Sequence, residues 1–184
     1  MTEVAKLCEA MKNRKPFIMK RILFTLLCGL CLNSNMAQTL PNFAAIPLST
    51  KEDFNEAANL AALQAANYLF STPMEKDNAD RLQSLQYIIR WMSGTPDYQF
   101  TLDAQATKFA RKNDDLLGLY MAAMVKYVLE NKDSAHDQEK IKLHAVQQLI
   151  TYAREEKNKV KLNAELKKAI AADAAGQLEE YLKK

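Results

Sequence analysis

The chain has 184 residues, 48% of them hydrophobic and 26% charged, a balance that is typical of a globular protein. With 25 basic and 22 acidic residues its formal net charge is +3. The sequence therefore lacks the strongly basic composition that is typical of nucleic-acid-binding domains.

Residues 1–37 are predicted to be an upstream extension followed by a secretory signal peptide. Residues 19–21 give a basic start, and residues 22–32 form an eleven-residue apolar run. A basic start, an apolar run of about 7–15 residues and a small residue before the cut describe such a signal. We therefore expect cleavage between Ala37 and Gln38, and export to the periplasm or the extracellular space.

All three cysteines precede the predicted cleavage site, so we expect a mature chain without thiols or disulfides. Cys28 and Cys31 each follow a leucine instead of the small residue that bacterial lipidation requires, which argues against a lipid anchor. Loss of residues 1–37 removes six basic and two acidic side chains and leaves 19 basic and 20 acidic, a net charge of −1. We therefore expect no nucleic-acid partner.

Residues 38–50 contain two prolines and are predicted to be an extended segment ahead of an all-helical domain at 51–184. Ser49 and Glu52 have the spacing of a capping box, which predicts a first helix over about 51–70. Two rows of alanines at four-residue spacing along this helix favour the close approach of a neighbouring helix. These rows are Ala57, Ala61 and Ala65, and Ala58, Ala62 and Ala66.

A second helix is expected to be capped by Asp77 or Asn78 and to run to about Ser93, with Gly94 as its stop. Apolar residues recur at spacings of three and four, which predicts the buried stripe of this helix. They are Leu82, Leu85, Ile89 and Met92.

The connection that follows, residues 95–102, is predicted to be extended. Tyr98, Phe100 and Leu102 alternate with polar residues, so we expect these three side chains to face the core.

The most apolar part of the predicted mature chain is residues 114–131, in which twelve of the fourteen residues at 116–129 are apolar. A helix that is apolar on nearly every side is normally buried on nearly every side. It is also too short to cross a bilayer, which needs ~20 apolar residues. We therefore expect a central helix with Leu119 and Val125 buried, and no membrane span in the mature chain.

Three further helices are expected: a short one at 104–112 that buries Phe109, one at 136–158, and an unbroken one from 163 to the end. Six helices with short connections predict an all-α, single-domain bundle of antiparallel hairpins. A solenoid-like stack of hairpins is the alternative.

Two segments carry a resemblance to a known group of proteins. Arg90–Tyr98 reads RWMSGTPDY and Leu116–Met124 reads LLGLYMAAM. With the leader that ends in Met-Ala, they resemble small exported all-helical proteins of Bacteroidetes-type bacteria. The resemblance implies export and an all-helical fold, and it implies no activity.

The mature sequence holds no group of residues that predicts catalysis, a cofactor or a metal. His136 and His144 are eight residues apart, whereas two ligands on one helix need a spacing of three or four. Asp114 and Asp115 are interpreted as a cap at the start of the central helix. Asp173 is expected at the edge of a buried stripe. An enzyme is therefore the least favoured class of function.

The function that the sequence favours is an exported, non-enzymatic module that binds another protein or an envelope component. Side chains at 97, 99 and 101 share one face of an extended segment, and aromatic residues carry much of the energy of interfaces. We expect Trp91, Tyr98 and Phe100 to seal the end of the core; the alternative is a recognition patch formed by Trp91, Asp97, Gln99 and Thr101.

The alternative function is a carrier of an apolar small molecule. In that hypothesis the alanine rows and adaptable methionine side chains line a cavity within the bundle. The methionines are Met92, Met121 and Met124.

The leader gives a prediction about processing. If it is a cleaved signal peptide, the mass of the exported protein should correspond to a chain that begins at or near Gln38. A mature protein that retains residues 22–32, or that carries lipid on Cys28 or Cys31, would contradict the prediction.

Overall fold

The computed structural model describes residues 40–104, 108–109 and 113–183. All of them belong to one unit, Gln38–Lys184. The leader and its expected cleavage site at Ala37 and Gln38 lie outside the described residues.

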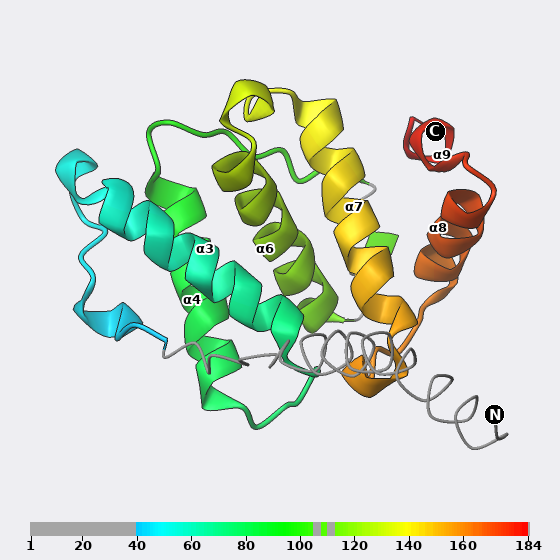
Figure 1. Ribbon diagram of the computed structural model, residues 1–184, viewed down its shortest axis with the longest axis horizontal. Helices are drawn as coiled ribbons and strands as arrows, with labels where there is room; N and C mark the ends of the chain where they lie inside the picture. The colour runs from blue at the N-terminus through cyan, green and yellow to red at the C-terminus, as the bar shows by residue number, and fades with distance from the viewer. Residues whose placement is uncertain (1–39, 105–107, 110–112, 184) are drawn as a thin grey trace, which may run out of the picture. The chain divides into compact units, whose positions relative to one another are not determined.

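The described residues form six α-helices and four short 3-10 turns, and they contain no strand (Figure 1). The fold is therefore the all-α bundle that the sequence predicts. The α-helices are α3 (Glu56–Ser71), α4 (Ala79–Gly94), α6 (Asp114–Glu130), α7 (Gln138–Arg154), α8 (Ala164–Ala174) and α9 (Leu178–Leu182). The 3-10 turns are η2 (Phe43–Ala45), η3 (Lys51–Asp53), η4 (Lys132–Ser134) and η5 (Glu156–Asn158).

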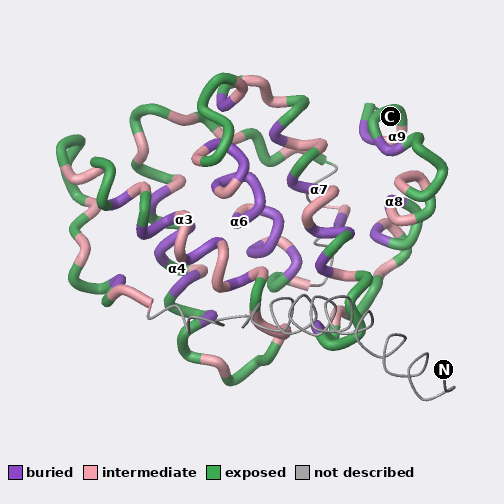
Figure 2. The backbone as a smooth tube through the Cα atoms, viewed as in Figure 1, coloured by how far each residue is buried: buried purple, intermediate pink, exposed green. Residues whose placement is uncertain are grey.

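Helix α6 lies at the centre, in contact with α3, α4 and α7. Its N-terminus is capped by Asn113, whose Oδ1 accepts the N–H of Leu116 at 3.3 Å. Figure 2 shows buried residues along most of its length. Leu119 and Val125 are both fully buried, which confirms the prediction of a central helix.

Helix α3 begins later than expected. Its cap is Asn55, whose Oδ1 accepts the N–H groups of Ala57 and Ala58 at 3.0 and 3.2 Å. The preceding residues form η3, in which the carboxylate of Asp53, and not of Glu52, accepts the N–H of Thr50 at 2.8 Å. The predicted capping box is therefore displaced by one residue, and the turn that it starts is a 3-10 turn.

The alanine rows of α3 face α4 and α6, as expected of a helix that other helices approach closely. Ala57 is the exception, because it lies exposed in the first turn. The five buried alanines are Ala58, Ala61, Ala62, Ala65 and Ala66.

The predicted buried stripe of α4 is wrong in its phase. Leu82 is 58% exposed and Ile89 42% exposed, while Leu85 and Met92 are half-buried. The core face of α4 lies further around the helix and consists of Arg81, Ser84, Tyr87, Ile88 and Trp91. The row Leu82, Leu85, Ile89 and Met92 is called the α4 strip below.

The prediction of one unbroken helix from residue 163 onward is also wrong. Gly176 has a φ of +68°, a left-handed conformation that glycine adopts without steric cost. The N–H of Gln177 donates to the carbonyl of Ala172 at 2.8 Å, and the N–H of Gly176 to that of Asp173 at 3.0 Å. This pair of bonds is the Schellman motif that ends helices, so α8 and α9 are separate.

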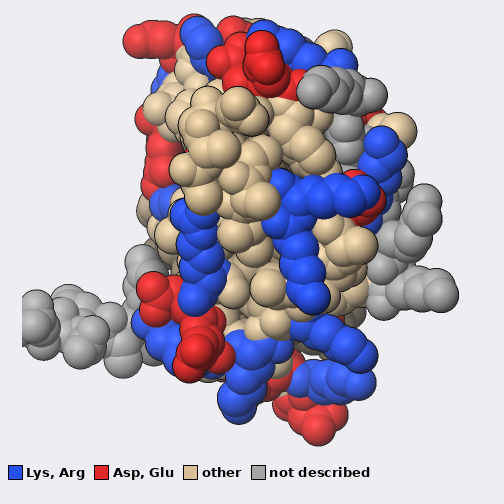
Figure 3. Space-filling view, turned by 90° about the vertical axis from the view of Figure 1, so that its right-hand side faces the viewer, with Lys and Arg blue, Asp and Glu red and all other residues tan. Residues whose placement is uncertain are grey.

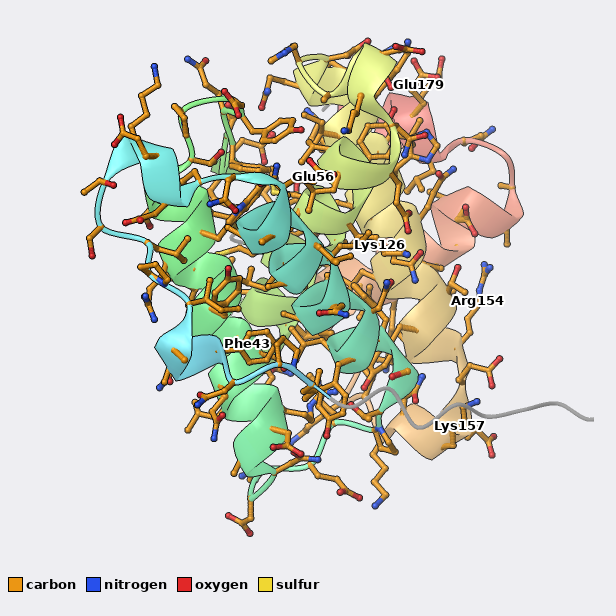
Figure 4. The ribbon with its side chains drawn as sticks, turned by 60° about the vertical axis from the view of Figure 1, so that its left-hand side comes forward. Phe43, Glu56, Lys126, Arg154, Lys157 and Glu179 are labelled. Carbon is orange, nitrogen blue, oxygen red and sulfur yellow. The ribbon has the colours of Figure 1, made fainter. Side chains whose placement is uncertain are left out.

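The segment expected to be extended at 38–50 contains the turn η2. Phe43 of this turn is buried, and its ring lies 4.9 Å from that of Tyr87 on α4 (Figure 4). The Phe43 side chain therefore packs the N-terminal part of the domain against α4.

The connection at 95–102 has no regular secondary structure, as predicted. Tyr98 and Phe100 pack on Trp91 with ring centroids 5.6 and 6.1 Å away, but Leu102 is exposed. The helix expected at 104–112 lies largely outside the described residues; Phe109 is buried as expected.

Leu119 gives a direct test of the central position of α6. Replacement of a fully buried leucine by alanine removes packed atoms and leaves a cavity, so L119A should lower the free energy of unfolding by ~2–5 kcal/mol. Leu60 on α3, which is 55% exposed, supplies the control. L60A should change this free energy by no more than about 0.5 kcal/mol. Equal effects of the two substitutions in urea titrations would show that α6 is not the centre of the core.

Candidate functional site

Trp91 does not contribute to a surface patch. Its side chain is fully buried, and its Nε1–H donates to Oδ1 of Asn59 on α3 at 3.1 Å. The expectation that one edge of the indole faces a partner is therefore wrong. Trp91 instead packs with Tyr98 and Phe100 in the core, as the other interpretation of these aromatic residues expects.

The outward row of the 95–102 segment is exposed, with Asp97, Gln99 and Thr101 all accessible. The backbone of the segment is held by Gln138, the first residue of α7. Its Nε2 donates to the carbonyl of Gln99 at 3.0 Å, and its Oε1 accepts the N–H of Thr101 at 3.2 Å. The side-chain amide of Gln138 thus supplies two of the hydrogen bonds that a neighbouring strand would give to an extended segment.

The α4 strip is only partly covered by the rest of the domain. Leu85 lies close to α6: a Cβ atom added at Gly118 would lie 2.7 Å from Leu85 Cδ1. Gly118 therefore lets α4 approach α6 along one edge of the strip. Leu82 and Ile89, two turns apart on the other edge, remain in solvent.

A small cleft of about 100 Å³ lies at the N-terminal end of the strip, between the loop after α3 and the first turns of α4 and α6. We call it the Arg81 cleft. It is lined by Leu69, Glu75, Lys76, Asn78, Arg81, Leu82, Leu85, Asp115, Gly118 and Leu119.

Arg81 is 8% exposed, which is unusual for a charged side chain. Its Nη1 donates to the carbonyls of Leu69 and Thr72 at 2.8 and 2.9 Å, and lies 2.8 Å from Thr72 Oγ1. These carbonyls end α3, where the helix dipole favours a cation. One nitrogen of the guanidinium therefore caps the C-terminus of α3.

A chain of hydrogen bonds links the end of α3 to α7 and to the residues that follow α7. The hydroxyl of Tyr152 on α7 donates to the carbonyl of Thr72 at 2.6 Å, and burial raises the pKa of Tyr152. Asn158, which is buried, donates from Nδ2 to the carbonyl of Tyr152 at 2.9 Å and accepts the N–H of Met74 at 3.1 Å. Arg81 is thus held by a fixed set of backbone carbonyls.

A larger cleft of about 630 Å³ lies between η2 and α4 and opens to solvent. Phe43, Tyr87 and Ile89 give it an apolar part, and burial raises the pKa of Tyr87 to about 12. The remaining lining is Ala44 and the polar residues Asn42, Gln83, Gln86 and Arg90.

The methionines predicted to line an interior cavity are divided between core and surface. Met124 is fully buried, while Met92 and Met121 are half-buried and pack against the core.

The face that carries α8 shows many basic side chains (Figure 3). Several of them are in ion pairs: Arg154 with Asp173 at 2.9 Å, and Lys168 with Glu165 at 2.9 Å. Since acids on the same face balance much of this charge, it is a weak basis for binding an anionic polymer. The ion pair with Arg154 places Asp173 at the edge of the core, where it was expected.

The two histidines lie apart, each stacked on a tyrosine. His136 lies 6.4 Å from Tyr98, and His144 lies 4.6 Å from Tyr127 between ring centroids. Both are exposed. Over the described parts of the chain, no cluster of three or more His, Cys, Asp or Glu side chains could hold a metal ion. Within the same residues, no helix has the length and apolar character needed to cross a membrane.

No protein family, curated protein or solved structure matches the chain.

Gln138 gives a prediction about the 95–102 segment. Q138A removes two hydrogen bonds to its backbone, so we expect the amide of Thr101 to exchange with deuterium faster and the free energy of unfolding to fall by about 0.5–1.5 kcal/mol. Q86A, on the exposed side of α4, is the control. Unchanged exchange at Thr101 in Q138A would show that Gln138 does not hold the segment.

Proposed function

We propose that the domain is a non-enzymatic binding module of an exported protein, and that it binds another polypeptide through the α4 strip. The observation that carries the proposal is the exposure of Leu82 and Ile89 on a row of four apolar residues. Export rests on the leader and on the resemblance to exported helical proteins.

The spacing of the strip supports a polypeptide as the partner. Residues at i, i+3, i+7 and i+10 form one continuous face of a helix, the pattern by which helices dock on apolar surfaces of other proteins. The described core uses only the edge of this face, at Leu85 and Met92. Helix α4 thus carries more apolar side chains than its own core buries, and a partner that covers Leu82 and Ile89 would explain them.

A carrier of an apolar small molecule is the second candidate. The observation that favours it is the cleft between η2 and α4, whose volume of about 630 Å³ falls in the range of about 300–1,000 Å³ that ligand pockets occupy. In this hypothesis Phe43 and Ile89 contact the ligand at the surface of the bundle, in place of the interior alanines that the sequence suggested.

The test compares three variants of the exported protein in capture experiments with envelope extracts. The double variant L82Q/I89Q removes the exposed part of the strip, and L60Q is matched to it as an exposed leucine on another helix. D97A/Q99A removes the outward row of the 95–102 segment. All three should unfold within about 0.5 kcal/mol of the original protein because these positions are exposed.

We expect L82Q/I89Q to lose the captured protein while L60Q and D97A/Q99A retain it. Loss only in D97A/Q99A would move the binding surface to the 95–102 segment. Capture that survives in every variant, with an apolar compound retained in native mass spectrometry, would favour the carrier. A concentration-dependent dimer that L82Q/I89Q abolishes would identify the partner as a second copy of the chain.

A further inference from the structure

We propose that Arg81 receives a carboxylate, and that the polypeptide bound by the α4 strip presents it as its C-terminus, with an aliphatic last residue. This inference rests on the proposed function, since it names the part of the partner that reaches the Arg81 cleft.

The first observation is the set of donors that Arg81 does not use to cap α3. A guanidinium carries five N–H groups, two of them on Nη1. The three hydrogen bonds of the side chain to Leu69 and Thr72 are all made by Nη1, and the guanidinium also interacts with the hydroxyl of Tyr152. Nε and Nη2 donate to none of the acceptors at the end of α3. Nε and one N–H of Nη2 point from the same edge, which is the fork that a carboxylate binds with both oxygens.

The second observation is the charge of Arg81. A buried cation is normally paired with an anion, because an unpaired charge is costly to remove from water. No carboxylate of the described residues forms an ion pair with Arg81, and the end of α3 supplies only a partial negative charge of about 0.5. A ligand carboxylate would complete this pairing.

The third observation is the size and lining of the Arg81 cleft. At about 100 Å³ it lies well below the range of about 300–1,000 Å³ that pockets for whole drug-sized ligands occupy. Leucines 69, 82, 85 and 119 line it beside the guanidinium. A C-terminal residue fits this combination, because its carboxylate and its aliphatic side chain leave the same Cα atom.

The acids in the cleft limit what it accepts. Glu75 is paired with Lys159, whose Nζ lies 3.2 Å from its Oε1, so its charge is balanced. Asp115 also lines the cleft and forms no ion pair with the described residues. A ligand with a single negative charge is therefore favoured over a polyacid, because Asp115 repels a second carboxylate.

The experiment uses N-acetyl-Ala-Ala-Leu with a free carboxylate and the same peptide with a C-terminal amide. Each is titrated into ¹⁵N-labelled protein in its exported form, with the Nε–H signal of Arg81 and the amide signals of residues 115–119 as readouts. The free acid should shift these signals saturably. The amide should bind about tenfold more weakly or worse, because hydrogen bonds between charged groups contribute most.

Variants separate the two halves of the site. L82Q should weaken binding of the free acid severalfold, since Leu82 is the exposed wall of the cleft, while L60Q should leave it unchanged. D115N should tighten binding at low salt by removal of the repulsion. R81K keeps the charge and loses the fork, so it should lose the difference between acid and amide. If R81K fails to fold, the shift of the Arg81 signal in the unaltered protein and the binding changes in L82Q and D115N still test the inference.

Equal binding of acid and amide, or shifts located away from the Arg81 cleft, would overturn the inference. Tighter binding of 3-methylbutanoate than of the peptide acid would also overturn it, because the carboxylate would then come from a free small molecule. These results are independent of partner capture. Loss of capture in L82Q/I89Q with equal binding of acid and amide would leave the proposed function standing and refute only the role of Arg81.

Discussion

The rest of the domain depends on the burial of α6. A helix with ten buried residues needs neighbours on almost every side, and α3, α4 and α7 supply them. Its polar groups lie at the margins. Lys126 reaches Asn67 on α3 at 2.7 Å and pairs with Glu130 on its own helix (Figure 4). Tyr120 is the exception: its buried hydroxyl has no partner among the described residues, and burial raises its pKa.

Because α6 must be covered closely on most sides, α4 packs against it in an orientation that leaves part of the α4 strip exposed. The alanines of α3 leave room for helices to approach, and Gly118 of α6 leaves room for Leu85. Helix α4 can therefore cover α6 with one edge of its strip and face α3 with its aromatic residues. The other edge, at Leu82 and Ile89, has nothing left to cover within the described domain. The proposed binding face is thus a consequence of how the centre is packed.

The parts of the fold that were predictable are those set by local chemistry. Asn78 caps α4 through a bond from the N–H of Arg81 to its Oδ1 at 3.0 Å, and the apolar pattern of α7 places Ile141 and Leu149 in the core. The break at Gly176 was missed because an isolated glycine also occurs within helices, and only its left-handed φ separates the two cases.

The face of α4 that is buried could not be predicted from the spacing of its apolar residues alone. Two faces of this helix are apolar in sequence, one aliphatic and one aromatic. The aromatic face was selected by bonds to distant residues, from the hydroxyl of Tyr87 to the carbonyl of Ala58 and from Trp91 to Asn59. For the same reason the sequence missed Arg81, whose role depends on carbonyls nine and twelve positions away. The only available signal was a basic residue on a helix face that also carries Tyr87, Ile88 and Trp91.

Trp91 is the only tryptophan of the chain, and it lies where α3, α4 and the 95–102 segment meet. The tryptophan fluorescence of the protein, excited at wavelengths that tyrosine does not absorb, therefore comes from this one buried site. The wavelength of maximum Trp91 emission would report whether residues 95–102 are packed on the helices, and no attached dye is needed. Trp91 is thus a built-in fluorescence probe of the packing between α3, α4 and residues 95–102, several turns of helix away from the Arg81 cleft.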